Sequence, residues 1–302
     1  MHNNNFTLLP EGLAINEPDE ELLKVINNKT FDDKVLFNTE SAFHDISVVE
    51  NEIGRFLHYK DTYQAGFINT EFYKGNLPYI NYFLLPYLLK KDVKNILLIG
   101  FGTGKIVKDF EYLFENLEKI TAVDIEENIL NIAEEYFGFK NSEKFEFILQ
   151  DGIAFLRNSK TKYDLIVVDV ANNNGIESRF FDEEYLDLIK KSLKKGGIFV
   201  SNLCASPDLE NPKNVFFAKI KKMYSEKFKH LNIFKGDYSD KVYYKSFFGI
   251  DKRVIDVTNI IIIASDSYLF DGSFTLDSCS KEKIGGINVD IEEYLNDLSV
   301  CN

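Results

Sequence analysis

The chain has 302 residues, of which 45% are hydrophobic and 14% aromatic, and its formal net charge is -13. This length allows one large domain or two smaller ones, each with a substantial core. The acidic balance argues against a general nucleic-acid-binding role, which would favour a basic face. The three cysteines form no C-x-x-C pair and the four histidines lack metal-ligand spacing. We therefore expect neither a disulfide framework nor a metal site.

The sequence also shows no targeting or membrane-spanning segment. Its start, MHNNNFTLLPEG, has no basic stretch followed by an apolar one. The longest apolar runs, near FLLPYLL and IIIIA, are much shorter than the roughly 20 residues of a membrane span. We therefore expect a cytoplasmic protein that does not enter a membrane.

Polar sequence fills the first 35 residues, with one helical stretch around Asp19 to Asn27. The segment DISVVENEIGRFLHYKD then alternates apolar and polar residues around a turn at Asn51–Gly54, which predicts a β-hairpin. TYQAGFIN adds a further strand, and LPYINYFLLPYLLKK has the apolar spacing of a helix that ends in lysines.

From Asn95 onward, strand patterns alternate with helix patterns. The strands expected are NILLIG, KITAVDI, FEFILQD, YDLIVVDV and IFVSNL, with VTNIIIIAS as a late addition. Parallel strands joined by helices predict a doubly wound α/β sheet, which binds ligands beyond the carboxyl ends of its strands.

Three alternate glycines, Gly100, Gly102 and Gly104, follow the first of these strands. Their spacing does not fit a P-loop, and Lys105 stands where a dinucleotide fingerprint needs its third glycine. The remaining G-x-G-x-G pattern is typical of nucleoside-sulfonium binding in methyltransferase-like folds. Small residues here allow backbone N–H groups to reach the ligand.

Acidic residues follow the next three strands. Asp124 is placed to accept hydrogen bonds from both ribose hydroxyls, and Asp151 from an adenine amino group. Asp169 could orient or deprotonate an amine or hydroxyl nucleophile. Each acid also has a structural alternative: a helix N-cap for Asp124 and Asp151, and hydrogen bonds to loop amides for Asp169.

Read together, these segments resemble the spermidine synthase family. SAFHDISVVENEIGRFLHYKD resembles the family's S-x-Y-Q-x-I-x-V-x-E and G-R-x-L segments, and ILLIGFGTGKI its V-L-V-I-G-G-G-D-G-G. AVDIEENILNIAEEYF, LQDGIAFL and YDLIVVDVANNNG resemble the V-D-I/L-D segment, the G-D-G/A segment and the stretch with the catalytic aspartate. The similarity runs from about Phe37 to Ala264.

The resemblance implies a Rossmann-like sheet of the S-adenosylmethionine-dependent methyltransferase type (77–302), preceded by a small N-terminal β domain (36–76) and an extension (1–35). It implies S-adenosylmethionine, or its decarboxylated form, as the donor, a small-molecule acceptor and a homodimer. Asp169 would be catalytic. The donor-binding set implied is Gln64, Gly100, Gly102, Thr103, Gly104, Asp124, Ile125, Asp151 and Gly152. The acceptor-binding set is Tyr63, Tyr73, Lys74 and Asn172.

The chain also departs from the family pattern. Thr103 stands for an aspartate of the glycine motif, and Asn172 for the second aspartate of D-x-x-D. Lys74 and Gly75 replace the histidine and glutamate of Y-H-E, and His44 replaces the first motif's glutamine. Losing two acids weakens the attraction for a cationic diamine, because close charge pairs in a partly buried site contribute a few kcal/mol each.

These departures make methyl transfer from S-adenosylmethionine the leading hypothesis, since Thr103 removes a charge that would repel the donor's carboxylate. Transfer of an aminocarboxypropyl group from the same donor is equally compatible. The alternatives are a divergent aminopropyltransferase that uses decarboxylated S-adenosylmethionine and a non-catalytic ligand-binding homologue.

Overall fold

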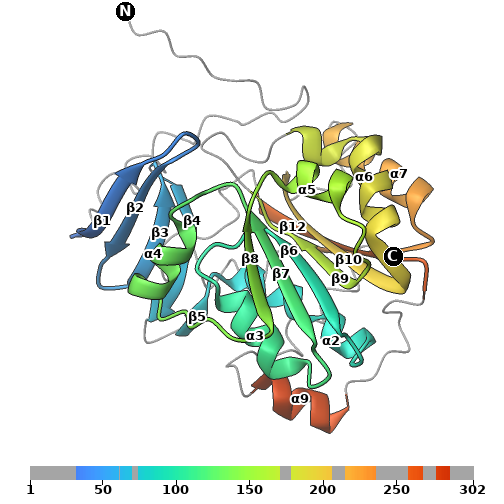
Figure 1. Ribbon diagram of the computed structural model, residues 1–302, viewed down its shortest axis with the longest axis horizontal. Coiled ribbons are helices and arrows are strands. Elements are labelled where there is room, and N and C mark those ends of the chain that lie inside the picture. The colour runs from blue at the N-terminus through green and yellow to red at the C-terminus, as the bar shows by residue number, and fades with distance from the viewer. Residues whose placement is uncertain are drawn as a thin grey trace, which may run out of the picture.

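The computed structural model describes residues 32–60, 62–69, 74–170, 178–205, 215–235, 258–267 and 277–285. The helix expected around Asp19 to Asn27 lies outside these ranges, as do Tyr73 and Asn172. The strands and helices of the described residues form two sheets with the covering helices of the larger one (Figure 1).

The smaller sheet is an antiparallel meander with the strand order β1-β2-β3-β4-β5. Its strands are β1 (Lys34–Glu40), β2 (Asp45–Glu50), β3 (Gly54–Tyr59), β4 (Thr62–Asn69) and β5 (Lys74–Asn76). The predicted hairpin is confirmed as β2–β3. The side chain of Asn51 closes its turn by accepting hydrogen bonds from the amides of Ile53 (2.9 Å) and Gly54 (3.2 Å).

The single helix expected from LPYINYFLLPYLLKK is wrong in detail. The structure has a 3₁₀ helix, η1 (Pro78–Leu84), followed by one turn of α-helix, α2 (Pro86–Leu89). Pro86 has no N–H and therefore cannot continue an α-helical ladder, so the chain restarts there. Tyr79 of η1 reaches Asp169, just beyond the carboxyl end of β9 in the larger sheet.

The larger sheet has the order β11-β12-β10-β9-β6-β7-β8. Its strands are β6 (Asn95–Ile99), β7 (Lys119–Asp124), β8 (Phe145–Leu149), β9 (Tyr163–Val168), β10 (Leu193–Ala205), β11 (His230–Lys235) and β12 (Thr258–Ser265). β6 to β10 run parallel, whereas β12 is antiparallel to both β10 and β11. The doubly wound α/β prediction is confirmed, although β11 was not predicted.

Helices cover both faces of this sheet, which explains why its strands read as continuous apolar runs. They are α3 (Lys105–Leu113), α4 (Ile129–Tyr136), α5 (Gly152–Asn158), α6 (Glu183–Ser192), α7 (Val215–Lys227) and α9 (Ser278–Gly285), with the short η2 (Ser178–Phe181) before α6. Ile96 and Leu98 of β6 belong to the core shared with α3, α4 and the small sheet, whereas Leu97 and Ile99 pack with α5 to α7. Figure 1 shows α5, α6 and α7 together on one side.

The connection order reverses between β6 and β9, which lie side by side in the sheet. A crevice beyond the strand ends at such a reversal is where doubly wound sheets bind their ligands. The glycine turn and Asp169 both follow these two strands, so the fold itself predicts that they meet.

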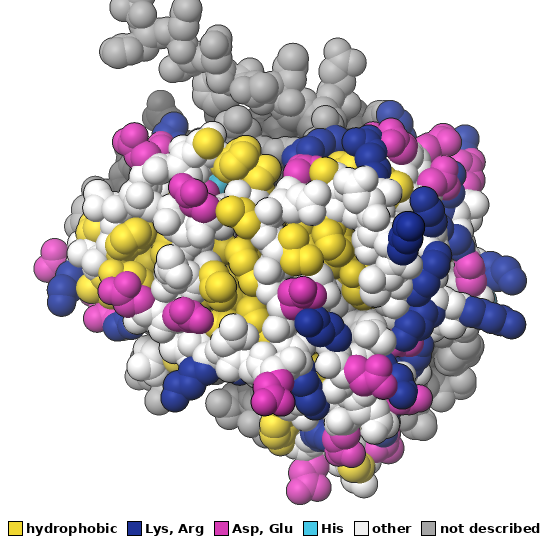
Figure 2. Space-filling model, in the orientation of Figure 1, with side chains coloured by type: hydrophobic (Ala, Val, Ile, Leu, Met, Phe, Trp, Pro, Cys, Tyr) yellow, Lys and Arg dark blue, Asp and Glu magenta, His cyan; other side chains and the backbone are white. Residues whose placement is uncertain are grey.

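The visible surface is mixed in charge, with apolar side chains gathered near the centre of the face in Figure 2, over the region of α4 and β8 in Figure 1. Phe43 and Leu149 are among the large apolar side chains that remain about half exposed. Within the described residues, every helix is too short or too polar to cross a membrane.

Candidate active site

The turn after β6 needs glycine for both conformation and space. Gly100, Gly102 and Gly104 have φ angles of 91°, 56° and 73°, a left-handed region that other residues rarely adopt. A Cβ atom at position 100 would lie only 2.0 Å from the carbonyl oxygen of Asp169. The backbones of the two predicted site segments are therefore in direct contact, and the amide of Asp169 donates to Ile99 O (2.9 Å).

Asp124 ends β7 with its carboxylate turned toward the glycine turn. Its Oδ2 accepts from the amide of Phe101 (2.7 Å) and its Oδ1 from the amide of Glu126 (2.9 Å). Burial raises the pKa of Asp124, and these two backbone hydrogen bonds oppose that rise. A carboxylate oxygen can accept more than one hydrogen bond, so both oxygens of Asp124 keep capacity to accept hydrogen bonds from a diol.

Asp169 follows β9 and is held by two neutral groups. Asn202 of β10 donates from Nδ2 to Oδ1 (2.9 Å), and the Tyr79 hydroxyl of η1 donates to Oδ2 (3.2 Å). Burial raises the pKa of Asp169 to about 6, although both hydrogen bonds lower it. A carboxyl group with this pKa exchanges its proton close to neutral pH, as a general base requires.

Sequence reasoning missed Tyr79 and Asn202. The tyrosine expected at the acceptor, Tyr73, lies outside the described residues, whereas Tyr79 contacts the carboxylate. Asn202 lies near the carboxyl end of β10, and its Nδ2 also donates to Asn259 Oδ1 of β12 (3.0 Å). Its position at a strand end was the only signal the sequence offered.

Tyr59, at the end of β3, lies among the carboxylates. Burial raises its pKa well above the usual value, and the negative charges of Asp124, Glu126 and Asp169 raise it further. Three acids, at or just beyond the ends of β7 and β9, therefore lie close enough for their charges to act on one phenol from the small sheet. Such a concentration of negative charge suits a cationic ligand.

Asp151 is the N-cap of α5, the alternative that the sequence left open. Its Oδ1 accepts from the amide of Ala154 (2.8 Å), and its Oδ2 pairs with Arg179 Nη1 (2.6 Å). Gly152, the first residue of α5, packs closely on β6, because a Cβ there would lie 2.4 Å from Ile99 Cγ2. Contacts of Asp151 and Gly152 to a nucleoside stay predictions.

The small sheet brings Gln64 to the site through its backbone. The carbonyl oxygen of Gln64 lies 3.4 Å from the Tyr79 hydroxyl. Tyr63 lies on the same strand opposite His58, and Lys74 pairs with Asn69 across β4 and β5. Binding roles for Gln64, Tyr63 and Lys74 stay predictions, as do those of Tyr73 and Asn172.

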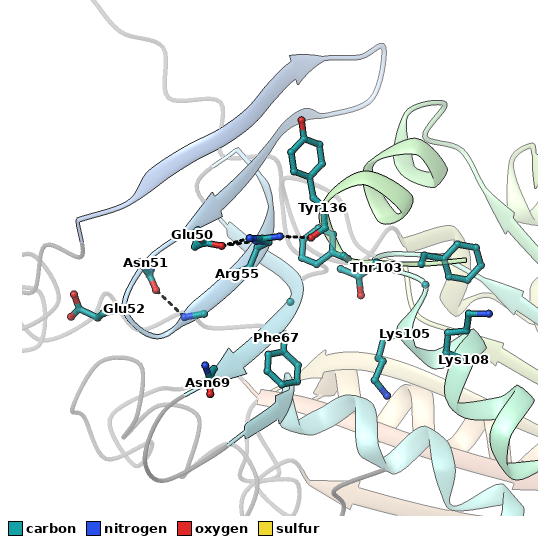
Figure 3. Close-up of a pocket in the computed structure, with 16 residues that line it drawn as sticks. Glu50, Asn51, Glu52, Arg55, Phe67, Asn69, Thr103, Lys105, Lys108 and Tyr136 are labelled. Atoms are coloured by element: carbon teal, nitrogen blue, oxygen red, sulfur yellow. Dashed lines mark hydrogen bonds and ion pairs between the residues drawn. The ribbon is translucent and has the colours of Figure 1, made fainter. Parts of the chain in front are cut away.

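Two cavities flank these residues. The larger, about 620 Å³, lies between the small sheet and α3 and is lined by Phe67, Arg55, Thr103, Lys105 and Lys108 among others (Figure 3). Each of these three cations has a carboxylate partner: Glu50 for Arg55, Asp109 for Lys105 and Glu111 for Lys108. Thr103 thus lines a cavity in which Arg55, Lys105 and Lys108 are each paired with a carboxylate.

The smaller cavity, about 300 Å³, lies between the β1–β2 turn and the ends of β7 and β8. Ile125, Leu149 and Phe43 give it apolar walls, and Glu126 and Gln150 contribute polar atoms. Ile125 directly follows Asp124, so a flat apolar ring placed here would be adjacent to the carboxylate proposed for the ribose.

The family follows from comparison with known proteins. The model of the spermine/spermidine synthase domain matches residues 83–234, half of the chain. The chain belongs to the spermine/spermidine synthase family. The matched segment includes the glycine turn, Asp124, Asp151 and Asp169, and it ends within β11.

Curated members of the family are related at moderate identity. A polyamine aminopropyltransferase of Clostridium botulinum (strain Eklund 17B / Type B) is 28% identical over 205 residues, which cover 66% of this chain and 68% of that protein. One from Buchnera aphidicola subsp. Acyrthosiphon pisum (strain Tuc7) is 26% identical over 175 residues, covering 56% and 59%.

Solved spermidine synthase structures share the fold over almost the whole chain. A spermidine synthase in complex with the transition state analogue AdoDATO has a TM-score of 0.65 at 18% identity and covers 91% of this chain and 89% of that one. The Thermotoga maritima enzyme gives 0.64 at 17% identity, covering 90% and 88%. The small β sheet and the methyltransferase-like larger sheet are thus family features.

Proposed function

We propose that the protein transfers an aminopropyl group from decarboxylated S-adenosylmethionine to a primary amine of a diamine or polyamine. The observation that carries this proposal is Asp169, a carboxyl group of pKa about 6 at the reversal point of the sheet, which accepts hydrogen bonds from the neutral groups of Tyr79 and Asn202. The names of the curated relatives and the AdoDATO complex support the same reaction.

The donor would bind across the ends of β6 and β7. Asp124 keeps free acceptor positions for the two ribose hydroxyls, and the adenine ring would lie against Ile125 in the smaller cavity. The backbone of the glycine turn would approach the sulfonium end without side chains in the way. The residues present therefore fit a nucleoside donor.

The acceptor would bind beside Asp169, on the side of Tyr59, whose pKa the negative charges of Asp169 and Asp124 raise. The neutral amine nitrogen attacks the methylene carbon next to the sulfonium, a C–N bond forms, and the C–S bond breaks to leave neutral 5′-methylthioadenosine. Asp169 accepts the proton that the nitrogen loses. The protein mainly aligns the reactants and takes this proton, since the sulfonium carbon is already electrophilic.

Incubation with decarboxylated S-adenosylmethionine and a panel of diamines and polyamines tests the proposal. We expect 5′-methylthioadenosine and an aminopropylated amine in equal amounts by mass spectrometry. A panel in which the donor stays intact, at enzyme concentrations where it binds, would overturn the transfer reaction and favour the ligand-binding homologue.

Thr103 favours a second candidate, methyl or aminocarboxypropyl transfer from intact S-adenosylmethionine, since the family's aspartate at this position would repel the donor's carboxylate. The variant Thr103→Asp distinguishes the two. We expect about a tenfold shift in relative donor affinity toward the decarboxylated form, the size of one partly screened charge pair. A wild-type protein that binds intact S-adenosylmethionine more tightly and methylates an acceptor would establish the second candidate instead.

A further inference from the structure

One fully buried carboxylate beside the proposed donor site has no part in the reaction above. Glu126 has no exposed surface and lies two residues after Asp124. Its Oε2 accepts from Ser41 Oγ (2.6 Å) and lies 3.3 Å from His44 Nδ1. A carboxylate only accepts hydrogen bonds, so Nδ1 carries the hydrogen in this contact.

The contact partners come from the β1–β2 turn, which is built to hold them. Ser41 Oγ accepts from the amides of Phe43 (3.0 Å) and His44 (2.9 Å), and Ser41 N donates to His44 O (2.9 Å). The His44 ring stacks on Tyr59, with centroids 4.0 Å apart and 15° between planes. Packing and hydrogen bonds therefore fix the orientation of His44, which is itself 6% exposed.

On its other side, Glu126 shapes the loop that presents Asp124. Its Oε1 accepts from the amide of Asn128 (3.3 Å), and its own amide donates to Asp124 Oδ1 (2.9 Å). The second oxygen of Asp124 binds the amide of Phe101 in the glycine turn. A continuous chain of hydrogen bonds thus runs from His44 to both elements that would hold the donor.

We propose that His44 is a positioning residue for the donor nucleoside: it donates a hydrogen bond to the buried Glu126 and so holds the loop on which Asp124 meets the ribose. This inference rests on the proposed function, because it assumes that a nucleoside occupies the site. Removing the donor of a hydrogen bond to a buried carboxylate leaves that carboxylate short of a partner, so the loop would rearrange to hydrate Glu126. Asp124 would then lose its orientation while Asp169, on β9, would keep its own.

Three variants test the proposal: His44→Leu, which fills the space without a donor; His44→Gln, whose amide still donates; and Glu126→Gln, which removes the charge. Calorimetric titration with 5′-methylthioadenosine reads the nucleoside site directly. We expect His44→Leu to weaken binding about tenfold, the worth of a hydrogen bond to a charged group, and His44→Gln to keep the affinity within about threefold. In the Glu126→Gln background, His44→Leu should cost less than about threefold, because no buried charge remains.

Steady-state kinetics supplies a readout that a general loss of stability would not give. The donor KM should rise about tenfold in His44→Leu while kcat at saturating donor stays within about threefold. Equal affinities for wild type and His44→Leu would overturn the role of His44, as would equal losses in the Leu and Gln variants. A wild-type protein that binds no nucleoside would instead refute the proposed function, which separates the two failures.

Discussion

An aspartate lies at each end of strand β9, and the pKa of one is lowered whereas that of the other is raised. Asp164 lies at the start of β9. The amines of Lys90 and Lys194 are 2.9 and 2.8 Å from its carboxylate oxygens, and the Asn95 amide donates to it as well (3.0 Å). Burial raises its pKa, but these hydrogen bonds and charges together bring the pKa down to about 2. Asp169, directly after the other end, accepts hydrogen bonds from the neutral Tyr79 and Asn202, and burial raises its pKa to about 6.

This difference separates a carboxylate that stabilises the fold from the one proposed to accept the proton. Asp164 belongs to β9 and Asp169 directly follows it, so the apolar sequence between them does not distinguish the two. The partners do: cations stabilise the charged form of Asp164, whereas the environment of Asp169 leaves its proton exchangeable near neutral pH. Three substitutions and one pH series test this difference between Asp164 and Asp169.

The largest effect is expected for Asp169→Asn. Loss of a general base lowers kcat by about 10²- to 10⁴-fold. Affinity for 5′-methylthioadenosine should remain within about threefold, since Asp124 and the glycine turn are unchanged. Initial rates and calorimetric titration measure both quantities. A variant with near wild-type kcat would remove Asp169 from the chemistry.

The matched change at the other end, Asp164→Asn, should act on stability. It leaves Lys90 and Lys194, 25% and 34% exposed, without their carboxylate partner. We expect the free energy of unfolding to fall by about 2–4 kcal/mol, less than for a fully buried pair because the lysines reach solvent. Urea denaturation measures the loss. The kcat of the folded variant should match wild type, and a large fall in kcat would contradict the division of roles.

The same contrast predicts the acid sensitivity of the fold. The pKa of Asp164 is about 2 in the folded state and about 3.9 when unfolded, so its stabilisation of about 2.5 kcal/mol is present above pH 4 and is lost as pH falls toward 2. Unfolding free energies measured between pH 5 and 2 should show this slope in the wild type. A slope that persists unchanged in Asp164→Asn would assign it to other groups.

The smallest effect is expected for Tyr79→Phe. The Tyr79 hydroxyl donates to the charged form of Asp169 and so lowers its pKa; without it the pKa rises above about 6. The rising limb of the kcat/KM profile should therefore move to higher pH by about half to one unit, and the rates should converge near pH 8. Tyr87→Phe, on α2 beside Lys91, is the control and should leave the midpoint in place.

Much of the site could be predicted because strand ends in a doubly wound sheet meet at one edge. That rule predicted that Gly100, Asp124 and Asp169 lie at neighbouring strand ends, as the structure has them, and the hairpin around Asn51 followed from alternation. It could not find Tyr79 or Tyr59, which reach the edge from a 3₁₀ helix and from the other sheet. Contacts between segments so distant in sequence leave no periodic pattern.

Other misses have local causes. β11 is a short edge strand, and its HLNIFK segment is too brief for a clear period. His44 was visible as a departure from the family motif, yet its contact with Glu126 depends on how the β1–β2 turn packs on β7. Asp151 lies beyond the end of β8 and is also the N-cap of α5. One carboxylate has enough acceptor positions to cap a helix and to bind a ligand, so the sequence could not choose between the two roles.

The placement of Tyr59 and His44 has a thermodynamic consequence. Tyr59 ends β3 and His44 lies in the β1–β2 turn, whereas Asp124 ends β7 and Glu126 follows it. A nucleoside bound between these two groups would favour the arrangement in which the small sheet is docked on the larger one. Occupancy at one hundred times Kd would make detachment of the small sheet about 2.7 kcal/mol harder. The bound substrate would thus hold the small sheet against the larger one, and proteolysis at the junction of the two sheets should slow in its presence.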